Sequence, residues 1–320
     1  MKLLLIHTGG TIATERRDGA LSVTSKSTDR LIEMYRNLGG TAEFEVDSPF
    51  DILSETMNTD NLLQLSECIK KHEAEKYDGI IVTHGTDTVQ YTSAYLSYAF
   101  GLCETPIVVV SANYPLSDSR SNGIANFSAA ADFIMTAKRQ GVFVAYRNTG
   151  KSKTELHRGT RLLAHEVYDD SLKSVFNSPF GSVESGKFIA NPNYSENKSK
   201  AAINPCFNKG VLYIRPYFGQ RYPDPQGYKA VLLEGYHSGT LNTAGEELKG
   251  FCRKAAGFEI PVYLTGNSDG FEYETKREYD SLGIITLPPA APTAMYVKLL
   301  TLAETELYRI TEPIGGDFLR

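Results

Sequence analysis

The chain has 320 residues, of which 41% are hydrophobic and 22% charged, and its formal net charge is −5. A chain of this length is expected to form about two domains and can bury a large core without disulfides. Charges of both signs are mixed throughout, without a basic patch or tail, which argues against a nucleic-acid-binding protein and against an electrostatic membrane anchor.

The four cysteines, Cys68, Cys103, Cys206 and Cys252, lie far apart in the sequence. Because no two of them form a Cys-x-x-Cys pair, the spacing implies neither a zinc site nor a disulfide framework. The first apolar run stops at His7, short of a signal peptide, and no apolar run reaches the roughly 18 residues of a membrane span. We therefore expect a cytoplasmic protein with free thiols.

Short apolar runs recur along the chain, each followed by small or polar residues. Their length and their hydrophobicity on both faces are typical of strands in a buried parallel sheet. The strands predicted in this way cover Leu3–Ile6, Gly79–Val82, Ile107–Val110, Val142–Ala145, Val231–Leu233, Val262–Leu264 and Ile284–Leu287.

Helical patterns lie between several of these strands. A helical repeat of apolar residues follows the polar start Asn58-Thr59-Asp60, and Thr243-Ala244-Gly245-Glu246 has the pattern of a capping box for a helix near 244–256. Strands that alternate with helices predict an α/β protein with a three-layer, doubly wound parallel sheet.

Residues 186–210 interrupt this alternation. The stretch from Asn191 to Lys200 is polar and offers almost nothing to bury, which favours an exposed linker or hairpin between domains. We predict a larger N-terminal α/β domain over residues 1–185, a linker over 186–210 and a smaller C-terminal α/β domain over 211–320.

Two strings of threonine and glycine follow predicted strands. Thr8-Gly9-Gly10-Thr11 comes after the first strand, and Thr83-His84-Gly85-Thr86-Asp87 ends the strand that begins at residue 79. Because ligands bind at the carboxyl ends of parallel strands, both strings are expected at the same functional edge of the sheet. Glycine lets the backbone approach a ligand closely, and amides at a helix start after Asp87 could hold a carboxylate or an oxyanion.

Each string also has a purely structural interpretation. Two glycines after a strand commonly form a tight turn, and an aspartate such as Asp87 commonly caps a helix. The glycines fit neither G-x-G-x-x-G nor G-x-x-x-x-G-K-[ST], so no nucleotide-binding fingerprint is met. The repetition of the same chemistry at two strand ends favours a functional site over two unrelated turns.

The order of these motifs resembles that of the bacterial L-asparaginase family. Thr8-Gly9-Gly10-Thr11-Ile12-Ala13 is similar to the first signature of that family, and His84-Gly85-Thr86-Asp87-Thr88 is similar to the second. Leu53-Ser54-Glu55-Thr56-Met57-Asn58 resembles its substrate-binding segment, and Ser111-Ala112-Asn113 resembles its strand end after the second signature. The matches fall in order within residues 1–130, and the resemblance is weak beyond residue 210.

The resemblance implies a role for each matching residue. Thr11 would attack the side-chain amide carbon of the substrate, and Thr86 would be the second active-site threonine. Asp87 would bind the α-amino group of the substrate and Ser54 its α-carboxylate. The remaining substrate contacts implied by the resemblance come from Gly10, Glu55, Gly85 and Ala112.

The resemblance also implies how the protein is organised and what it does. The larger N-terminal domain would be the catalytic one, and its active site would lie near the interface of a homodimer or homotetramer. The expected reaction hydrolyses the side-chain amide of asparagine, or a related small amide, to aspartate and ammonia, without a cofactor or a metal. The expected partner is a small amino acid, with no nucleic acid and no membrane.

Two residues that the family keeps near its nucleophile are missing. Ala20 or Leu21 stands where the loop after the first signature should carry a tyrosine, and residues 162–164 stand where a lysine is expected. The serine motif also begins with Leu53 instead of aspartate. A threonine hydroxyl is a poor nucleophile without help from a base, and general acid–base assistance typically contributes about 10²–10⁴ in rate.

These departures leave three functions open. The first is an amidohydrolase with an acyl-Thr11 intermediate, assisted by Arg16, Arg17 or His165, although the residue types favour solvated loop charges for the arginines and a surface or core position for the histidine. The second is a non-catalytic amino-acid-binding protein on the same scaffold. The third is an ammonia-donating subunit of a transamidation complex, against which the lack of a visible basic surface counts.

Overall fold

The structure is a computed structural model that describes residues 1–10, 12, 14–17, 20–23, 26–266 and 273–319, with the backbone alone described at 14–17, 20–23 and 26–27. The chain forms two compact units. The first contains Met1–Tyr194, Lys198–Ala202 and Ile314–Gly316, and the second contains the remaining residues between Ser195 and the C-terminus. None of the described helices is both long enough and apolar enough to cross a membrane.

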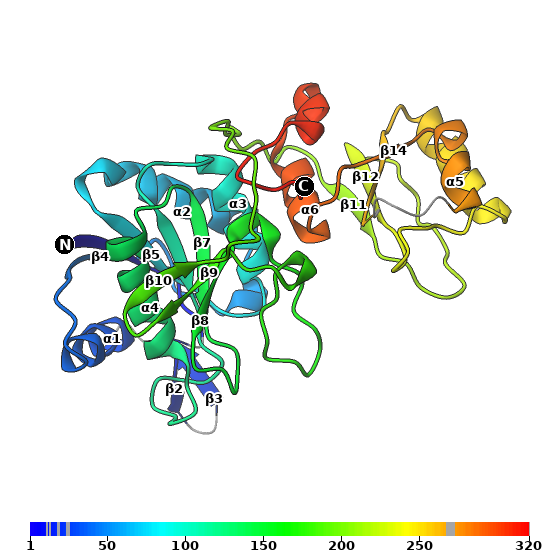
Figure 1. Cartoon of the computed structure of the whole chain (residues 1–320). Coiled ribbons are helices and arrows are strands. Elements are labelled where there is room, and N and C mark those ends of the chain that lie inside the picture. Colours follow the sequence, from blue (N-terminus) through cyan, green and yellow to red (C-terminus); the bar gives the residue numbers. More distant parts are fainter. Residues whose placement is uncertain (11, 13, 18–19, 24–25, 267–272, 320) are drawn as a thin grey trace. The chain divides into compact units, whose positions relative to one another are not determined.

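The first unit is built on an eight-stranded sheet with the order β10-β9-β8-β7-β6-β5-β1-β4 (Figure 1). The five strands from β4 to β7 are parallel, and β8, β9 and β10 are antiparallel to their neighbours. The strand bounds are Lys2–His7 for β1, Glu43–Asp47 for β4, Gly79–Thr83 for β5, Ile107–Val110 for β6, Val142–Tyr146 for β7, Thr154–Arg158 for β8, Gly181–Glu184 for β9 and Lys187–Ala190 for β10.

A separate antiparallel pair, β2 (Thr14–Arg17) and β3 (Ala20–Val23), follows β1. The first unit also has short 3-10 helices, which are η2 (Ser54–Thr56), η3 (Ala74–Lys76), η4 (Gly159–Arg161) and η5 (Val175–Asn177).

Helices cover both faces of the large sheet. α1 (Lys26–Asn37) and α4 (Gly123–Ala137) lie on one face, and α2 (Thr59–Lys71) and α3 (Val89–Phe100) lie on the other (Figure 1). Burial on both faces explains why all four residues from Leu3 to Ile6 are inaccessible to solvent and apolar. The predicted doubly wound, three-layer α/β fold is confirmed for this unit.

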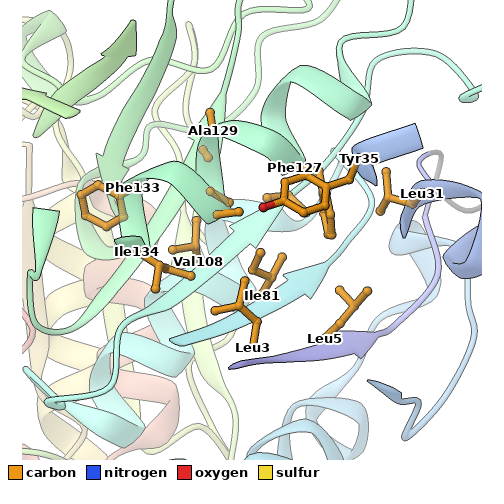
Figure 2. Packing of buried hydrophobic residues seen from close by; sticks show 14 of the residues in the cluster. Leu3, Leu5, Leu31, Tyr35, Ile81, Val108, Phe127, Ala129, Phe133 and Ile134 are labelled. Atoms are coloured by element: carbon orange, nitrogen blue, oxygen red, sulfur yellow. The ribbon is translucent and has the colours of Figure 1, made fainter. Parts of the chain in front are cut away.

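The core beneath α1 and α4 is packed with aromatic and branched side chains (Figure 2). Tyr35 of α1 and Phe127 of α4 meet edge to face, with ring centroids 5.7 Å apart, above Leu5 and Ile81 of the sheet. Burying each such side chain is worth about 1.5–3 kcal/mol, so this core fixes the strands firmly. The core therefore holds the carboxyl ends of β1 and β5 rigidly in place.

Residues Lys187–Ala190, at the start of the segment expected to be a linker, form β10 and pair with β9. No strand or helix follows until Val211. The segment Ile314–Gly316 returns to the first unit, where Thr160 Oγ1 donates to the Gly315 carbonyl at 2.9 Å and Arg161 Nε donates to the Gly316 carbonyl at 2.8 Å. The predicted bounds of 1–185, 186–210 and 211–320 stay a prediction.

The second unit has a four-stranded parallel sheet with the order β11-β12-β13-β14. Its elements are β11 (Val211–Ile214), β12 (Ala230–Glu234), α5 (Glu246–Gly257), β13 (Val262–Thr265), η6 (Glu274–Glu278), η7 (Asp280–Leu282), β14 (Ile284–Thr286), α6 (Pro292–Thr301) and η8 (Glu304–Thr311). Leu248, Phe251 and Cys252 of α5 pack against the sheet in a separate core.

The predicted capping box at the start of α5 is wrong. The N-cap residue is Gly245, and no side chain caps the helix. The Thr243 hydroxyl, which should have capped it, instead donates a 2.9 Å hydrogen bond to Glu278 Oε1. By contrast, Asn58 does begin α2 with a capping box, since its side chain accepts from the Asp60 and Asn61 amides.

Candidate active site

The candidate site lies at the carboxyl ends of β1 and β5. The two strands pair in parallel with His7 opposite Thr83, so both threonine-glycine strings leave the sheet side by side. The Thr8 hydroxyl donates a 2.6 Å hydrogen bond to the Thr83 carbonyl and ties the two strand ends together. The shared edge that the motif spacing predicts is therefore present.

Three glycines allow the segments around this edge to touch through their backbones. A Cβ on Gly10 would lie 2.2 Å from the Gly85 amide nitrogen, and a Cβ on Gly85 would lie 2.4 Å from Ser54 Oγ. Gly9 has φ of +101°, and a Cβ there would lie 2.2 Å from the Ile52 carbonyl oxygen. No larger residue fits these positions without rearrangement. We call this contact of the segments after β1, after β5 and around η2 the glycine platform.

Ser54 and Asp87 bind each other on the glycine platform. Ser54 Oγ donates to Asp87 Oδ2 at 2.9 Å, and the Asp87 amide donates to Ser54 Oγ at 3.3 Å. The Thr88 hydroxyl donates to the Ser54 carbonyl at 2.9 Å, which fixes η2 against the start of α3. Ser54 is buried, whereas Asp87 and the neighbouring Glu55 are exposed. A hydroxyl and a carboxylate are thus presented together where a small molecule can reach the carboxylate.

The helix-cap interpretation of Asp87 does not hold. The N-cap residue of α3 is Thr88, and no side chain caps this helix. The Asp87 carboxylate bonds instead to Ser54, thirty-three residues earlier in the chain. An exposed carboxylate held by a buried hydroxyl is suited to binding a cationic group.

His84 supports the glycine platform from the interior. Its Nδ1 lies 2.7 Å from the Gly85 carbonyl oxygen, and its Nε2 lies 2.8 Å from the Thr92 hydroxyl. Burial lowers the pKa of His84 to about 4, so the ring is neutral at pH 7. Because a carbonyl only accepts, Nδ1 carries the proton and Nε2 accepts from Thr92. The ring holds the Gly85 peptide without adding charge to the site.

Thr86 is half-buried, and its carbonyl oxygen lies 3.3 Å from Nδ1 of His165. Of the three residues considered as substitutes for the missing family residues, His165 therefore contacts the second string. Arg16 and Arg17 lie on β2, but their side chains are outside the described part of the chain. Thr11, the expected nucleophile, also lies outside the described residues, so the structure does not place it.

Ala112 is the second residue after β6, and its side chain is buried in the core beneath α4. Asn126 Nδ2 donates to the Ser111 carbonyl at 2.8 Å. Asn113 and Asn122 exchange two hydrogen bonds of 3.0 Å, in which the backbone amide of each donates to the side-chain oxygen of the other. These bonds fix the segment, so a substrate contact at Ala112 would come from its backbone.

Asp51 belongs to this region, although the motifs do not reveal it. Its Oδ1 lies 3.1 Å from Nε2 of the buried His7, whose Nδ1 lies 3.1 Å from the Thr83 hydroxyl. This chain of contacts links the end of β1 with the loop before η2. Asp51 lies in an irregular segment without periodicity, so no sequence pattern could have identified it.

Most of the chain is similar to known proteins of one family. Residues 2–193 match the family model described as asparaginase, N-terminal. The chain is 32% identical over 343 residues to a glutamyl-tRNA(Gln) amidotransferase subunit of Methanosarcina mazei, covering 99% of this chain and 78% of that protein. It is 29% identical over 314 residues to the protein of the same name from Methanobrevibacter smithii, covering 92% of this chain and 70% of the relative.

Solved structures share the fold at lower identity. The thermostable L-asparaginase from Thermococcus kodakarensis superimposes with a TM-score of 0.80 at 22% identity, covering 100% of both chains. L-asparaginase I from Vibrio cholerae gives a TM-score of 0.78 at 20% identity, covering 100% of this chain and 99% of the other. Because the family model spans more than half of the sequence and a relative above 30% identity spans almost all of it, the chain belongs to the asparaginase family.

Proposed function

We propose that this protein is an amidohydrolase that hydrolyses the side-chain amide of asparagine, or of a closely related small amino acid, to the acid and ammonia. One observation carries the proposal. Ser54 and Asp87 come together on the glycine platform, at the sheet edge from which both threonine-glycine strings emerge. Their chemistry matches the two charged groups that every free amino acid carries.

The two groups have distinct parts in binding. The exposed Asp87 carboxylate would accept hydrogen bonds from the α-ammonium group of the substrate. The Ser54 hydroxyl donates to Asp87 Oδ2 in this structure, and on binding it would donate instead to the α-carboxylate of the substrate. Hydrogen bonds to charged groups contribute about 1.5–3 kcal/mol each, so the pair can select an amino acid over a simple amide.

We assign the nucleophile to Thr11 because of its place in the first string. Its hydroxyl oxygen would form a bond to the amide carbon, the C–N bond would break, and ammonia would leave with the hydroxyl proton. Water would then cleave the acyl ester and return the proton to Thr11. Backbone amides around Thr11 and Thr86 would stabilise the oxyanion, a contribution of roughly 10²–10³ in rate.

Ammonia release from a panel of primary amides, including asparagine and glutamine, tests the proposal. The Thr11→Ala variant should release no ammonia above background, whereas Thr105→Ala should behave as wild type. Thr105 is a suitable control because its hydroxyl donates to the Ala74 carbonyl, outside the site. Equal ammonia release by wild type and Thr11→Ala would contradict the assignment of Thr11 as the nucleophile. Tight calorimetric binding of aspartate without turnover of any amide would make the protein a binder instead.

A second candidate is favoured by the relatives. Those at 29% and 32% identity are each named as a subunit of glutamyl-tRNA(Gln) amidotransferase. In this alternative the same amidase chemistry supplies ammonia to a transamidation complex, and glutamine is the amide hydrolysed. Co-purification with a further subunit, and ammonia release that rises when that subunit and a glutamyl-tRNA are added, would establish it. If ammonia release by the isolated chain does not rise when these are added, the result would favour an amidohydrolase that acts alone.

We further propose a cytoplasmic homodimer or homotetramer that acts on a free amino acid. The four cysteines are unpaired, which supports a reducing compartment. Analytical ultracentrifugation of the full chain, with and without aspartate, would measure its oligomeric state.

A further inference from the structure

A second cluster of chemically active side chains lies on the first unit, apart from the residues assigned to amide hydrolysis. Asp47 is the last residue of β4, Cys68 lies within α2, and His72 follows α2 directly. Cys68 and His72 are four residues apart, so the helix presents both on the same face. That face is turned toward Asp47, because both side chains contact the same oxygen of this carboxylate.

The three side chains converge closely. Asp47 Oδ2 lies 2.7 Å from His72 Nε2 and 3.5 Å from Cys68 Sγ, and one ligand atom from each residue falls within 4.8 Å of the others. Ligand atoms around a tetrahedral zinc ion, at bond lengths of about 2.0–2.3 Å, are separated by roughly 3.3–3.7 Å. Side-chain movements of about 1 Å would therefore convert the cluster into a coordination site.

The surroundings of His72 strengthen this interpretation. Its second ring nitrogen, Nδ1, lies 3.5 Å from Glu45 Oε1 and 3.5 Å from the Tyr77 hydroxyl. A histidine that binds a metal through one nitrogen almost always donates its other N–H to a carboxylate, a carbonyl or water, which sets the tautomer and the ring orientation. Glu45 is placed to accept that proton, so the outer contact of such a site is already present.

An Asp47–His72 ion pair is the competing explanation. It accounts for two of the three groups but needs neither the buried thiol of Cys68 nor Glu45 behind the ring. Lys71 also approaches this carboxylate, with Nζ 4.0 Å from Asp47 Oδ2, but its side chain is 77% exposed. A thiol, an imidazole and a carboxylate together form a ligand set that favours zinc over magnesium or calcium.

We propose that Asp47, Cys68 and His72 bind one Zn²⁺ ion, with water in the fourth position and Glu45 orienting His72. Binding releases the Cys68 proton to solvent and forms the Zn–S bond, and no electron is transferred. The ion joins the end of β4 to the end of α2. The cysteine spacing did not indicate this site, because zinc sites are recognised in a sequence by closely spaced pairs of cysteines. The site proposed here contains a single cysteine.

Cobalt titration of the metal-free full chain tests the proposal, because Co²⁺ bound to a thiolate has a charge-transfer absorption in the near ultraviolet. The wild type should show this band, saturate at one Co²⁺ per chain and lose the band when Zn²⁺ is added. Cys68→Ser should lose the band, and Cys103→Ser should keep it. Cys103 is the matched control because its thiol donates to the Thr105 carbonyl, away from the cluster.

Two further measurements do not depend on a variant. X-ray absorption of the zinc-loaded wild type should show one sulfur ligand, with nitrogen and oxygen completing the shell. Zinc at a hundredfold excess over its Kd should raise the melting temperature by roughly 5–10 °C. The proposal would be overturned if the wild type showed no cobalt band or if the band persisted in Cys68→Ser. It would also be overturned if the X-ray absorption of the zinc-loaded protein showed no sulfur ligand.

Discussion

The contact between Gly85 and Ser54 leads to a sharp test of the glycine platform. Replacing Gly85 by alanine would put a methyl group 2.4 Å from Ser54 Oγ and 2.5 Å from Ser54 Cβ. The φ angle of Gly85 lies outside the left-handed region, so alanine meets no backbone strain there. The substitution therefore acts by pushing Ser54 away from Asp87.

The expected magnitudes follow from this contact. Forcing an extra methyl group into a packed site costs typically about 1–3 kcal/mol of unfolding free energy. Moving Ser54 also removes a hydrogen bond to a charged substrate group, worth about 1.5–3 kcal/mol. Affinity for aspartate, and kcat/KM for the amide substrate, should each fall by about 10- to 150-fold.

Calorimetry with aspartate and urea unfolding measure the two effects separately. Gly250→Ala is the matched control, because the nearest atom to its new Cβ would be Arg253 Nη2 at 3.8 Å, in α5 of the second unit. It should leave aspartate binding unchanged. The double variant Gly85→Ala, Ser54→Gly removes both clashing atoms and should regain most of the lost stability, but not the affinity.

One result would refute this reasoning. If Gly85→Ala bound aspartate as tightly as the wild type, the close approach of Gly85 to Ser54 would have no part in substrate binding. The proposal that Ser54 holds the α-carboxylate would then fail as well.

Three other perturbations test separate features. Asp87→Asn should weaken aspartate binding at least about 10-fold, with stability changed by less than about 0.5 kcal/mol because the carboxylate is exposed; calorimetry and thermal melting check both. Burial lowers the pKa of His157, like that of His84, to about 4, so the folded chain keeps the ring neutral while the unfolded chain protonates it below about pH 6.5. Stability is therefore lost as the pH falls from 6.5 toward 4, and His157→Gln should reduce the slope by about 1 kcal/mol per pH unit between pH 6 and 5 in urea unfolding. In the second unit Lys298 Nζ lies 2.7 Å from Asp317 Oδ2 with both side chains fully buried, so Lys298→Met should cost about 3–5 kcal/mol, and adding Asp317→Leu should recover a large part. A double variant no more stable than Lys298→Met would argue against an unpaired buried charge as the cause.

Strands that are buried on both faces could be predicted from the sequence. β1 and β5 appear as unbroken apolar runs because helices cover both sides of the sheet. β4 could not be found in this way, because it is an edge strand. Its residues Glu43–Asp47 are partly or fully exposed, and apolar residues alternate with charged ones along it.

β8 could not be predicted from the sequence either, but for a different reason. It carries His157 and Arg158, which are buried although polar. The Arg158 guanidinium lies 4.2 Å from the centroid of the Phe143 ring and donates to the Gln140 carbonyl at 3.0 Å. Such partners exist only after the chain has folded, so composition alone marks this strand as surface.

The candidate site likewise has parts that could be predicted from the sequence and parts that could not. The threonine-glycine strings are local patterns at strand ends, and their position can be predicted from the parallel sheet. The contacts of His165 with Thr86 and of Asp51 with His7 bring loop residues to strand ends or loops that are distant in the sequence. No periodicity encodes such contacts, because they depend on how loops of a given length close over the sheet edge.

The return of Ile314–Gly316 to the first unit affects how a newly made chain can mature. Thr160 and Arg161 are buried, and they lack the carbonyl acceptors of Gly315 and Gly316 until that segment has been translated. Residues 203–313 separate the two parts of the first unit, and at about 5–20 residues per second the ribosome needs roughly 6–22 s to translate these 111 residues. Until then the Thr160 hydroxyl, which is buried in the complete unit, lacks the Gly315 carbonyl, and an unpaired buried donor costs about 1–3 kcal/mol.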